Sequence, residues 1–574
     1  MRPFYPVLFL LLAWLPTTVF AQTITSFSPA SGNVGTLVTL TGTSLNLVTA
    51  VALNGTSCVL LDQTSTSLRL LVMPGTTSGP LTTTGGAPAA STSSFNVTTT
   101  ALSTTQQGPK LVGTGALGVG AQQGYSVALS ADGNTLAVGG NIDNSNVGAT
   151  WVFTRTGTTW SQQGPKLVGT GATGTSVLQG TSVALSADGN TLAVGGRGDN
   201  NNAGATWVFT RTGTTWDQQG PKLIGADSRA AGYSVALSAD GNTLAIGAPG
   251  TDFGLGATWV FTRTGTAWNQ QGPKLIRAGV NGSAVQQGFS VALSADGNTL
   301  ATGAPSDANE TGATWVFTRT GTTWSQQGPK LVGTGASGLY GVSQGTSIAL
   351  SADGNTLAAS GKFDNRFAGA TWVFTRTGTA WSQQGPKLVG TGAAGNSEAF
   401  QGTSVTLSAD GNMLAAGGSG DNGDVGATWV FTRAGTTWSQ QGPKLVGTGA
   451  FLGSVQQGQS VALSADGSTL ATGGWHDNNK LGATWVFSTV SAPLVQRAAA
   501  ELRASTTFFP NPVIEQLTIS GGARNGTLRL FDGTGRTLLT SGYHDGQPLN
   551  LSTLPAGLYW LQVDRAPARP MVKR

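Results

Sequence analysis

A unit of about 56 residues is repeated seven times, and this period constrains the fold more than any other feature. Each copy carries the tetrapeptide Ser-Ala-Asp-Gly, which starts at Ser130, Ser186, Ser238, Ser294, Ser351, Ser408 and Ser464. A fixed period of this length is typical of a solenoid, a propeller or an array. Because each unit consists of strand and turn patterns, the repeat predicts an all-β chain with a closed seven-bladed β-propeller over residues 104–490.

One copy divides into four predicted strands, a to d, over residues 126–130, 135–139, 149–155 and 160–168. Strand d contains Pro165, which cannot donate a ladder hydrogen bond, so strand d is expected at the outer edge of its blade.

The order of the strands also predicts how the ring closes. The repeat region begins with a lone strand d at 106–113 and ends with strands a to c at 458–487. The first segment is therefore expected to complete the last blade, which removes two free sheet edges.

Charge argues against a nucleic-acid partner. Residues 101–490 contain 19 Lys and Arg and 19 Asp and Glu, so the repeat region has no net charge. Nucleic-acid binders instead carry a basic patch or stripe.

The N-terminus has the pattern of a secretory signal peptide over residues 1–21. Arg2 supplies the positive end, residues 7–15 are apolar, and Val19-Phe20-Ala21 forms a small-residue cleavage site. The apolar stretch is too short to span a membrane, and no later stretch is long enough. The sequence therefore predicts a secreted protein without a transmembrane segment.

Residues 23–99 form a first unit of short alternating strands. The stretch from Ile24 to Gly32, followed by Gly35-Thr36-Leu37-Val38-Thr39 and Val72-Met73-Pro74, resembles the IPT/TIG family. The resemblance implies an immunoglobulin-like β-sandwich that serves as a spacer or an interaction module.

The repeat resembles the FG-GAP repeat of integrin-like propellers. Gly288-Phe289-Ser290, Gly303-Ala304-Pro305 and Gly312-Ala313 carry the resemblance most clearly. Family members place a calcium loop between strands a and b. Here that loop is only Asp132-Gly133-Asn134, so the family's calcium role is not expected to apply.

Residues 507–574 follow a predicted linker at 491–506. Phe508-Phe509-Pro510-Asn511-Pro512, Leu528-Arg529-Leu530-Phe531-Asp532 and Gly557-Leu558-Tyr559 resemble a type A sorting domain of the type IX secretion system. The resemblance implies a small C-terminal β-sandwich, export by that machinery, and a product that is released or attached to the outer-membrane surface.

Catalytic machinery is scarce, with two histidines and one cysteine in 574 residues. No nucleophile, base and orienting acid stand in a recognisable pattern, so we predict no catalytic residues and no enzymatic activity.

The seven copies differ mainly in the d–a segments and the b–c loops, which strand alternation places on one face of the ring. Binding residues usually lie on such loops. Each b–c loop contains an aspartate, which either forms an Asx turn or binds calcium or a sugar hydroxyl. The candidate ligand-binding residues are Asp143, Asp199, Asp252, Asp307, Asp364, Asp421 and Asp477.

The leading functional hypothesis is a secreted or cell-surface, non-enzymatic binding or adhesion protein whose ligand is an extracellular glycan or a protein. No cofactor is expected, apart from calcium at the loop aspartates, which stays open. The alternatives are a structural display protein without a specific ligand and a glycan-active enzyme.

Overall fold

The computed structural model describes residues 22–98, 102–118, 120–338, 341–395, 398–451 and 453–489 of the first part of the chain. In the C-terminal part it describes residues 507–509, 514–520, 525–532, 536–544, 547–563 and 569–573. The predicted signal peptide and linker lie outside these ranges. The chain forms two compact units, Met1–Thr489 and Val490–Arg574.

The N-terminal domain is a β-sandwich of short antiparallel strands around Leu40, Leu53 and Phe95, all of which are fully buried. Strand β2 (Ser31–Gly32) pairs in parallel with the last strand, and a 3₁₀ turn, η1 (Leu45–Leu47), follows β3. The remaining strands, in spatial order, are β1 (Thr23–Ser28), β3 (Leu37–Thr43), β6 (Ser67–Leu71), β5 (Thr56–Gln63), β4 (Ala50–Leu53), β7 (Gly79–Thr84) and β8 (Ala90–Val97).

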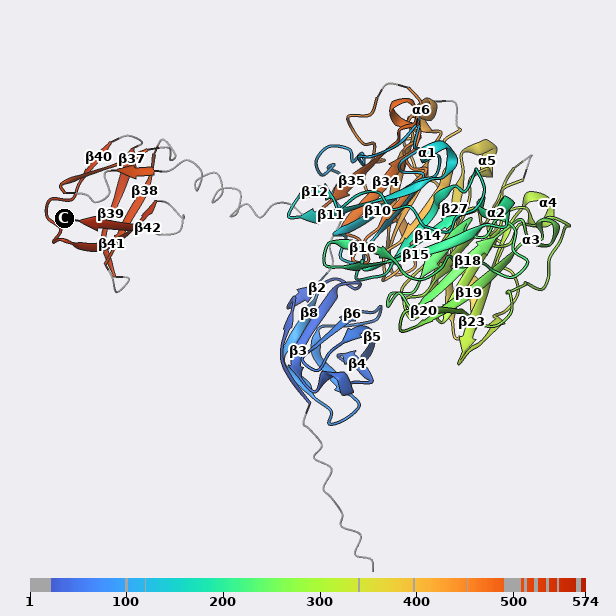
Figure 1. Ribbon diagram of the computed structural model, residues 1–574, viewed down its shortest axis with the longest axis horizontal. Helices are drawn as coiled ribbons and strands as arrows, with labels where there is room; N and C mark the ends of the chain where they lie inside the picture. Colours follow the sequence, from blue (N-terminus) through green and yellow to red (C-terminus); the bar gives the residue numbers. More distant parts are fainter. Residues whose placement is uncertain are drawn as a thin grey trace, which may run out of the picture. The chain divides into compact units, whose positions relative to one another are not determined.

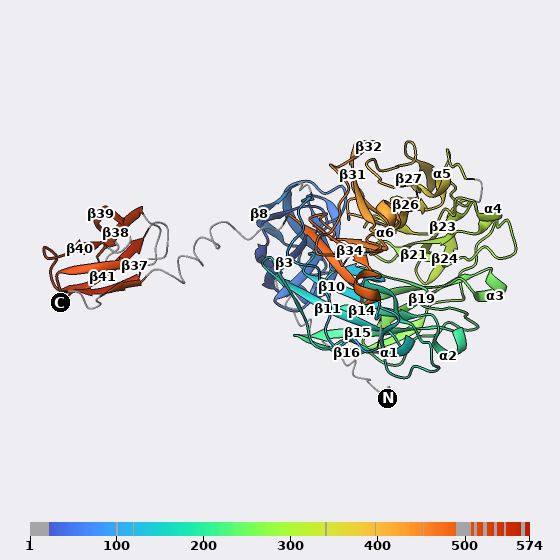
Figure 2. The ribbon, with the colours of Figure 1, turned by 90° about the horizontal axis from the view of Figure 1, so that it is seen from above.

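The repeats form seven antiparallel sheets in the described residues, and Figure 2 shows them following one another around a ring in chain order. The innermost strands are β9 (Ser126–Leu129), β13 (Gln179–Leu185), β17 (Ser234–Leu237), β21 (Ser290–Leu293), β25 (Ile348–Leu350), β29 (Gln401–Leu407) and β33 (Ser460–Leu463). The second strands are β10 (Thr135–Gly140), β14 (Thr191–Gly196), β18 (Thr243–Ala248), β22 (Thr299–Ala304), β26 (Thr356–Gly361), β30 (Met413–Gly418) and β34 (Thr469–Gly474). The predicted fold class, with its propeller, is confirmed.

The two outer strands of each sheet have nearly identical sequences. The third strands are β11 (Ala149–Thr156), β15 (Ala205–Thr212), β19 (Ala257–Thr264), β23 (Ala313–Thr320), β27 (Ala370–Thr377), β31 (Ala427–Ala434) and β35 (Ala483–Ser488). The fourth strands are β12 (Thr159–Gln162), β16 (Thr215–Gln218), β20 (Ala267–Gln270), β24 (Thr323–Gln326), β28 (Ala380–Gln383) and β32 (Thr437–Gln440). As expected, the fourth strand lies at the edge, but it ends before Pro165, and Leu167 then returns to pair with Thr150.

A central channel of about 310 Å³ is lined by the Val-Ala-Leu segments of the seven inner strands. The third-strand tryptophans, of which Trp151 is the first, are at most 1% exposed and wedge between adjacent blades. A Cβ at Gly113 would lie 2.1 Å from the Trp151 ring, so close packing requires glycine there.

The ring closes as the sequence predicts. Gln106 and Leu111 form antiparallel bridges to Phe487 and Thr484 of β35, in the place that a fourth strand takes in the other six sheets. The Leu111 amide donates to the Thr484 carbonyl at 2.7 Å, and the Thr484 amide returns a bond of 3.0 Å. The last sheet, which has only three strands of its own, is thereby completed.

The a–b turns form a second closed circuit, at one mouth of the channel. The amide of each Ser-Ala-Asp-Gly alanine donates to the carbonyl of the equivalent alanine in the next blade, at 2.8 to 3.0 Å. The last of these bonds runs from Ala465 back to Ala131. We call these seven residues the alanine ring: Ala131, Ala187, Ala239, Ala295, Ala352, Ala409 and Ala465.

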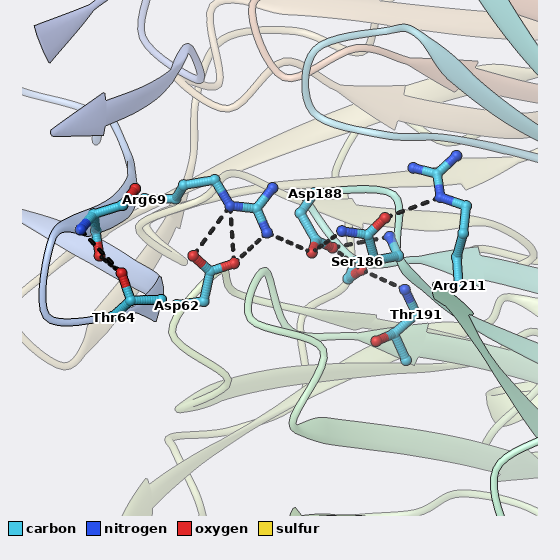
Figure 3. Close-up of polar contacts among 9 residues, drawn as sticks. Asp62, Thr64, Arg69, Ser186, Asp188, Thr191 and Arg211 are labelled. Atoms are coloured by element: carbon cyan, nitrogen blue, oxygen red, sulfur yellow. Dashed lines mark hydrogen bonds and ion pairs between the residues drawn. The ribbon is translucent and has the colours of Figure 1, made fainter. Parts of the chain in front are cut away.

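The N-terminal domain packs on the alanine ring. Leu71 and Met73 are buried in one apolar cluster with the alanines. The guanidinium of Arg69, on β6, pairs with Asp188 at 3.0 Å, and it also donates hydrogen bonds to the carboxylate of Asp62 (Figure 3). The invariant side of the ring is thus an intramolecular interface.

The opposite side of the ring carries seven short turns, and Figure 1 shows those labelled α1 to α6 on the side away from the blue N-terminal domain. Amides of the turns donate to carbonyls of the d–a segments, as from Asn144 to Leu117, so both variable regions share one face as predicted. The turns are α1 (Asp143–Asn146), α2 (Asp199–Asn202), α3 (Thr251–Gly254), α4 (Asp307–Glu310), α5 (Asp364–Phe367), α6 (Asp421–Asp424) and α7 (Asp477–Lys480).

The C-terminal unit contains two small antiparallel sheets in its described residues. Leu517, Leu528, Leu561 and Met571 are buried between them. One sheet contains β36 (Thr507–Phe509), β37 (Gln516–Ser520) and β40 (Pro548–Asn550). The other contains β39 (Thr537–His544), β38 (Asn525–Phe531), β41 (Gly557–Val563) and β42 (Arg569–Lys573).

Ring closure predicts unequal effects of proline at two adjacent positions. Leu111→Pro removes the amide that bonds to β35, and should lower the free energy of unfolding by about 1–3 kcal/mol. Val112→Pro is the matched control, because the Val112 amide has no protein acceptor among the described residues. Urea unfolding of both variants measures the difference, and equal losses would contradict the closure.

The Arg69 contact predicts a pH-dependent stability. Burial raises the pKa of Asp188, but hydrogen bonds from Ser186 and Asn190 and the Arg69 charge outweigh it, so the pKa lies below its ordinary value. Arg69→Gln should therefore cost about 1 kcal/mol near pH 7. A depressed carboxyl pKa stabilises above the unfolded pKa of about 3.9, so the difference should vanish as the pH falls through the lowered value. Unfolding at pH 7 and pH 3 checks this; a constant difference would argue against the pair.

Candidate functional site

Six of the seven predicted loop aspartates are buried and bind the loops to the ring. Asp143 has no exposed side-chain surface; its Oδ1 accepts the Leu117 amide at 2.7 Å, and its Oδ2 pairs with Lys166. The same two kinds of contact recur at Asp199, Asp307, Asp364, Asp421 and Asp477, which pair with Lys222, Lys330, Lys387, Lys444 and Lys110.

The third blade departs from this pattern. Thr251 occupies the buried position, where its hydroxyl accepts the Arg229 amide at 3.1 Å. Asp252 stands one residue later, 39% exposed, and pairs with Lys274 at 2.7 Å on the surface. The aspartate is thus not equivalent to the other six.

Burial argues against ligand contact at six of these aspartates, and at the exposed Asp252 such contact stays a prediction. Six carboxylates are out of reach of a solute, and each already accepts a lysine and an amide. In the part of the chain that the structure describes, no three acidic, histidine or cysteine side chains gather as a metal site would require. Six of the loop aspartates hold the variable face in place from below its surface, whereas Asp252 lies on that surface.

The turns that follow these aspartates have an unusual backbone. In each turn three consecutive residues have positive φ, as in Asn144 (51°), Ser145 (57°) and Asn146 (74°). The left-handed region is costly for residues other than glycine, and asparagine tolerates it best, which explains the asparagines in most turns. Phe253 adopts it at φ 59° with its ring fully exposed. Strain of this kind often accompanies functional loops.

Two positions per blade adjoin the inner and the second strand at their ends on the variable face, and we call them together the variable mouth. The first directly precedes the inner-strand segment that reads Ser-Val-Ala-Leu in five copies, Ser-Ile-Ala-Leu in the fifth blade and Ser-Val-Thr-Leu in the sixth, and the second directly follows the second strand. The first set is Tyr125, Thr181, Tyr233, Phe289, Thr346, Thr403 and Gln459. The second set is Asn141, Arg197, Pro249, Pro305, Lys362, Ser419 and Trp475.

Aromatic side chains of the variable mouth contact one another across blade boundaries. The rings of Tyr233 and Phe289 are 4.7 Å apart, and those of Tyr125 and Trp475 are 6.5 Å apart. Burial, and then the phenol of Tyr125, raises the pKa of Tyr233 to about 12, although the Arg197 charge lowers it.

A second aromatic group joins blades five and six. Phe363 lies 5.6 Å from Phe367 and 6.2 Å from Phe400, ring to ring. Phe367 and Phe400 both have positive φ, 68° and 51°, which is rare for bulky residues. Lys362 lies 5.0 Å from the Phe363 ring centre.

Two cations accompany these rings without a carboxylate partner. The Arg197 guanidinium lies 5.6 Å from the Tyr233 ring centre, and its Nε is buried without an acceptor. Burial lowers the pKa of Lys362. Among the described residues, neither cation is within ion-pair distance of a carboxylate. Arg197, Lys362 and the aromatic residues Tyr125, Tyr233, Phe289 and Trp475 are all partly exposed.

Sequence reasoning missed these residues because it selected the position that all loops share. Variation between copies could have found them, because residues of different chemistry occupy the two mouth positions in otherwise nearly identical copies. His476, which follows Trp475, bonds through Nδ1 to the Ser454 carbonyl at 2.8 Å, so its ring is held by the neighbouring segment.

The buried pairs predict a strong contrast between two conservative changes. Asp143→Asn leaves Lys166 without its partner in a mostly buried position and should cost about 3 kcal/mol of unfolding free energy. Asp252→Asn breaks a partly exposed pair and should cost less than about 1 kcal/mol. Chemical denaturation of both variants measures the contrast; similar costs would show that burial does not set the role of these residues.

Comparison with solved structures finds distant similarity to 576 chains, and three of these illustrate it. The Kuenenia stuttgartiensis hydrazine synthase is 13% identical, with a TM-score of 0.43 over 66% of this chain and 98% of that chain. An auxiliary nutrient binding protein from Bacteroides thetaiotaomicron is 10% identical, with a TM-score of 0.34 over 82% and 98%. A protein from Bacteroides uniformis, provisionally assigned as a 6-phosphogluconolactonase, is 13% identical, with a TM-score of 0.41 over 65% and 94%. Similarity at this level carries no information about activity.

Comparison with curated protein sequences finds no match. Two family models match parts of the chain: the IPT/TIG domain over residues 23–101 and the secretion system C-terminal sorting domain over residues 507–573. No helix among the described residues is long and apolar enough to cross a membrane. The sorting domain implies handling by the type IX secretion machinery. The chain thus combines an IPT/TIG domain with a C-terminal sorting domain, and it is a secreted or cell-surface protein.

Proposed function

We propose that this protein is a non-enzymatic binding protein, secreted or held at the cell surface, whose propeller is of the FG-GAP type and binds an extracellular ligand at the variable mouth. The observation that carries the proposal is the contrast between the two faces. The alanine-ring face is nearly invariant and is covered by the N-terminal domain. The variable mouth differs from blade to blade and presents partly exposed aromatic and cationic side chains.

Chemistry at the variable mouth supports binding more than catalysis. The channel wall consists of Val, Ala, Leu, Ile and one Thr, which offer no side chain suited to proton transfer. The loop carboxylates nearby are held by lysines and amides. Exposed aromatic rings on a rigid scaffold, in contrast, provide contact area at low entropic cost, as binding surfaces do.

The first experiment tests whether the protein binds a glycan, and a protein ligand is tested afterwards. The mature protein is screened against a broad panel of extracellular polysaccharides, once with calcium and once with EDTA. Saturable binding supports a binding protein, and its loss in EDTA would assign a role to calcium. Turnover of a polysaccharide would favour a glycan-active enzyme, and the absence of any ligand would favour a display protein.

The location of the site predicts a contrast between two variants. Tyr233→Ala removes a partly exposed aromatic ring from the variable mouth and should weaken binding by about 10-fold or more. Thr214→Ala changes an exposed residue in a c–d turn of the opposite face and should leave affinity unchanged. Calorimetry measures the affinity of both variants for the ligand, and circular dichroism checks that both are folded. Equal effects of the two variants on affinity would place the ligand elsewhere.

A further inference from the structure

We propose that the ligand of the variable mouth is an acidic glycan, a polysaccharide with uronate carboxylates, and that Arg197 and Lys362 recognise the carboxylates. This inference rests on the proposed function and specifies its ligand class. Recognition of an acidic glycan requires three properties of the site. The site needs positive charge without a carboxylate partner in the protein, apolar surfaces beside that charge for sugar rings, and selectivity against other polyanions.

The charge of the variable mouth is positive although the ring as a whole is neutral. Its fourteen positions include Arg197 and Lys362 but no aspartate or glutamate. The acidic residues of this face that lack a lysine partner stand in the d–a segments or in the turns: Asp227, Glu310, Glu398 and Asp424. These fourteen positions therefore carry a net positive charge.

Both cations are held in positions that an anion would stabilise. A partly buried charge has lost hydration, and this loss is compensated only when an opposite charge or a hydrogen-bond acceptor replaces the water. The Nε of Arg197 has no acceptor in the protein, and Lys362 is packed against Phe363. A carboxylate provides what each lacks, and the planar guanidinium can bind it through two parallel hydrogen bonds.

Each cation adjoins an aromatic surface. Tyr233 adjoins Arg197 and is itself packed on Phe289, while Phe363 adjoins Lys362 and is packed on Phe400. Aromatic residues such as these bring a large apolar face next to a polar group, which suits a sugar ring whose carboxylate projects from one edge. An aromatic ring is paired with a cation twice, at Arg197 and at Lys362, so the variable mouth offers a polymer two such places.

The same arrangement argues against a nucleic acid. Phosphate backbones are bound by extended basic tracks, and affinity grows with the number of phosphates neutralised. Two separated cations on a ring without net charge do not form such a track. The few charges and the flanking rings fit a polymer that carries one carboxylate for each sugar.

The test uses the full mature chain with a chemically matched pair of polysaccharides, polygalacturonate and its methyl ester, and sulfated dextran as a third probe. We expect saturable binding of polygalacturonate, which weakens as salt rises, and at least about tenfold weaker binding of the methyl ester, in which the carboxylates are neutralised.

Variants locate the recognition. Arg197→Gln and Lys362→Gln should each weaken polygalacturonate binding about tenfold, because each leaves a carboxylate without its cation. Arg366→Gln is the matched control: it removes an exposed cation at the tip of α5, four residues from Lys362, and should change affinity less than about twofold. Unchanged unfolding curves exclude misfolding as the cause.

The outcomes separate the two proposals. Equal binding of polygalacturonate and its ester, binding of sulfated dextran alone, or equal effects of all three variants would overturn the acidic-glycan assignment. If only neutral glycans bind, and Tyr233→Ala abolishes that binding, the proposed function stands while this inference fails. If no polysaccharide of either charge binds, both the acidic-glycan inference and the glycan form of the proposed function fail.

Discussion

The closed ring is the constraint on which the rest of the structure depends. Seven nearly identical sheets close only because residues 106–111 pair with β35 as its missing fourth strand. Closure leaves no free sheet edge at the start or the end of the ring, which is how propellers avoid edge-to-edge aggregation. It also lets the alanine amides form an uninterrupted circuit from Ala131 to Ala465 and back. A chain with one blade fewer would need a different geometry at every one of these contacts.

In the closed ring, the two faces have different roles. The alanine ring offers a flat apolar mouth, and the IPT/TIG domain covers it with Leu71 and Met73, secured by Arg69. The other face keeps its loops in place through the buried aspartate–lysine pairs, so the tips and the variable mouth can differ among blades without loss of the scaffold. Strained left-handed turns are tolerated there because the pairs fix both sides of each loop.

Much of the fold followed from the sequence, because repeats, strand alternation and proline have direct structural meaning. The all-β class, the closing strand and the shared face of the variable loops were all predicted. The structural role of the loop aspartates was not predicted. The sequence shows that an aspartate recurs in each loop, but not that Lys166 and its equivalents pair with it. In the third blade Thr251, and not Asp252, takes the buried position, and the sequence does not show this shift by one residue. The variable mouth depends on contacts across blades, such as Arg197 with Tyr233, which no single repeat reveals.

Hydrogen–deuterium exchange with and without polygalacturonate tests the central claim most directly, because it reports where a ligand sits without altering any residue. Binding at the variable mouth predicts slower exchange in the segments around Tyr125, Arg197, Tyr233 and Lys362, and unchanged exchange in the c–d turns and the IPT/TIG domain. Protection confined to the IPT/TIG domain or the c–d turns, with the variable mouth unchanged, would contradict it.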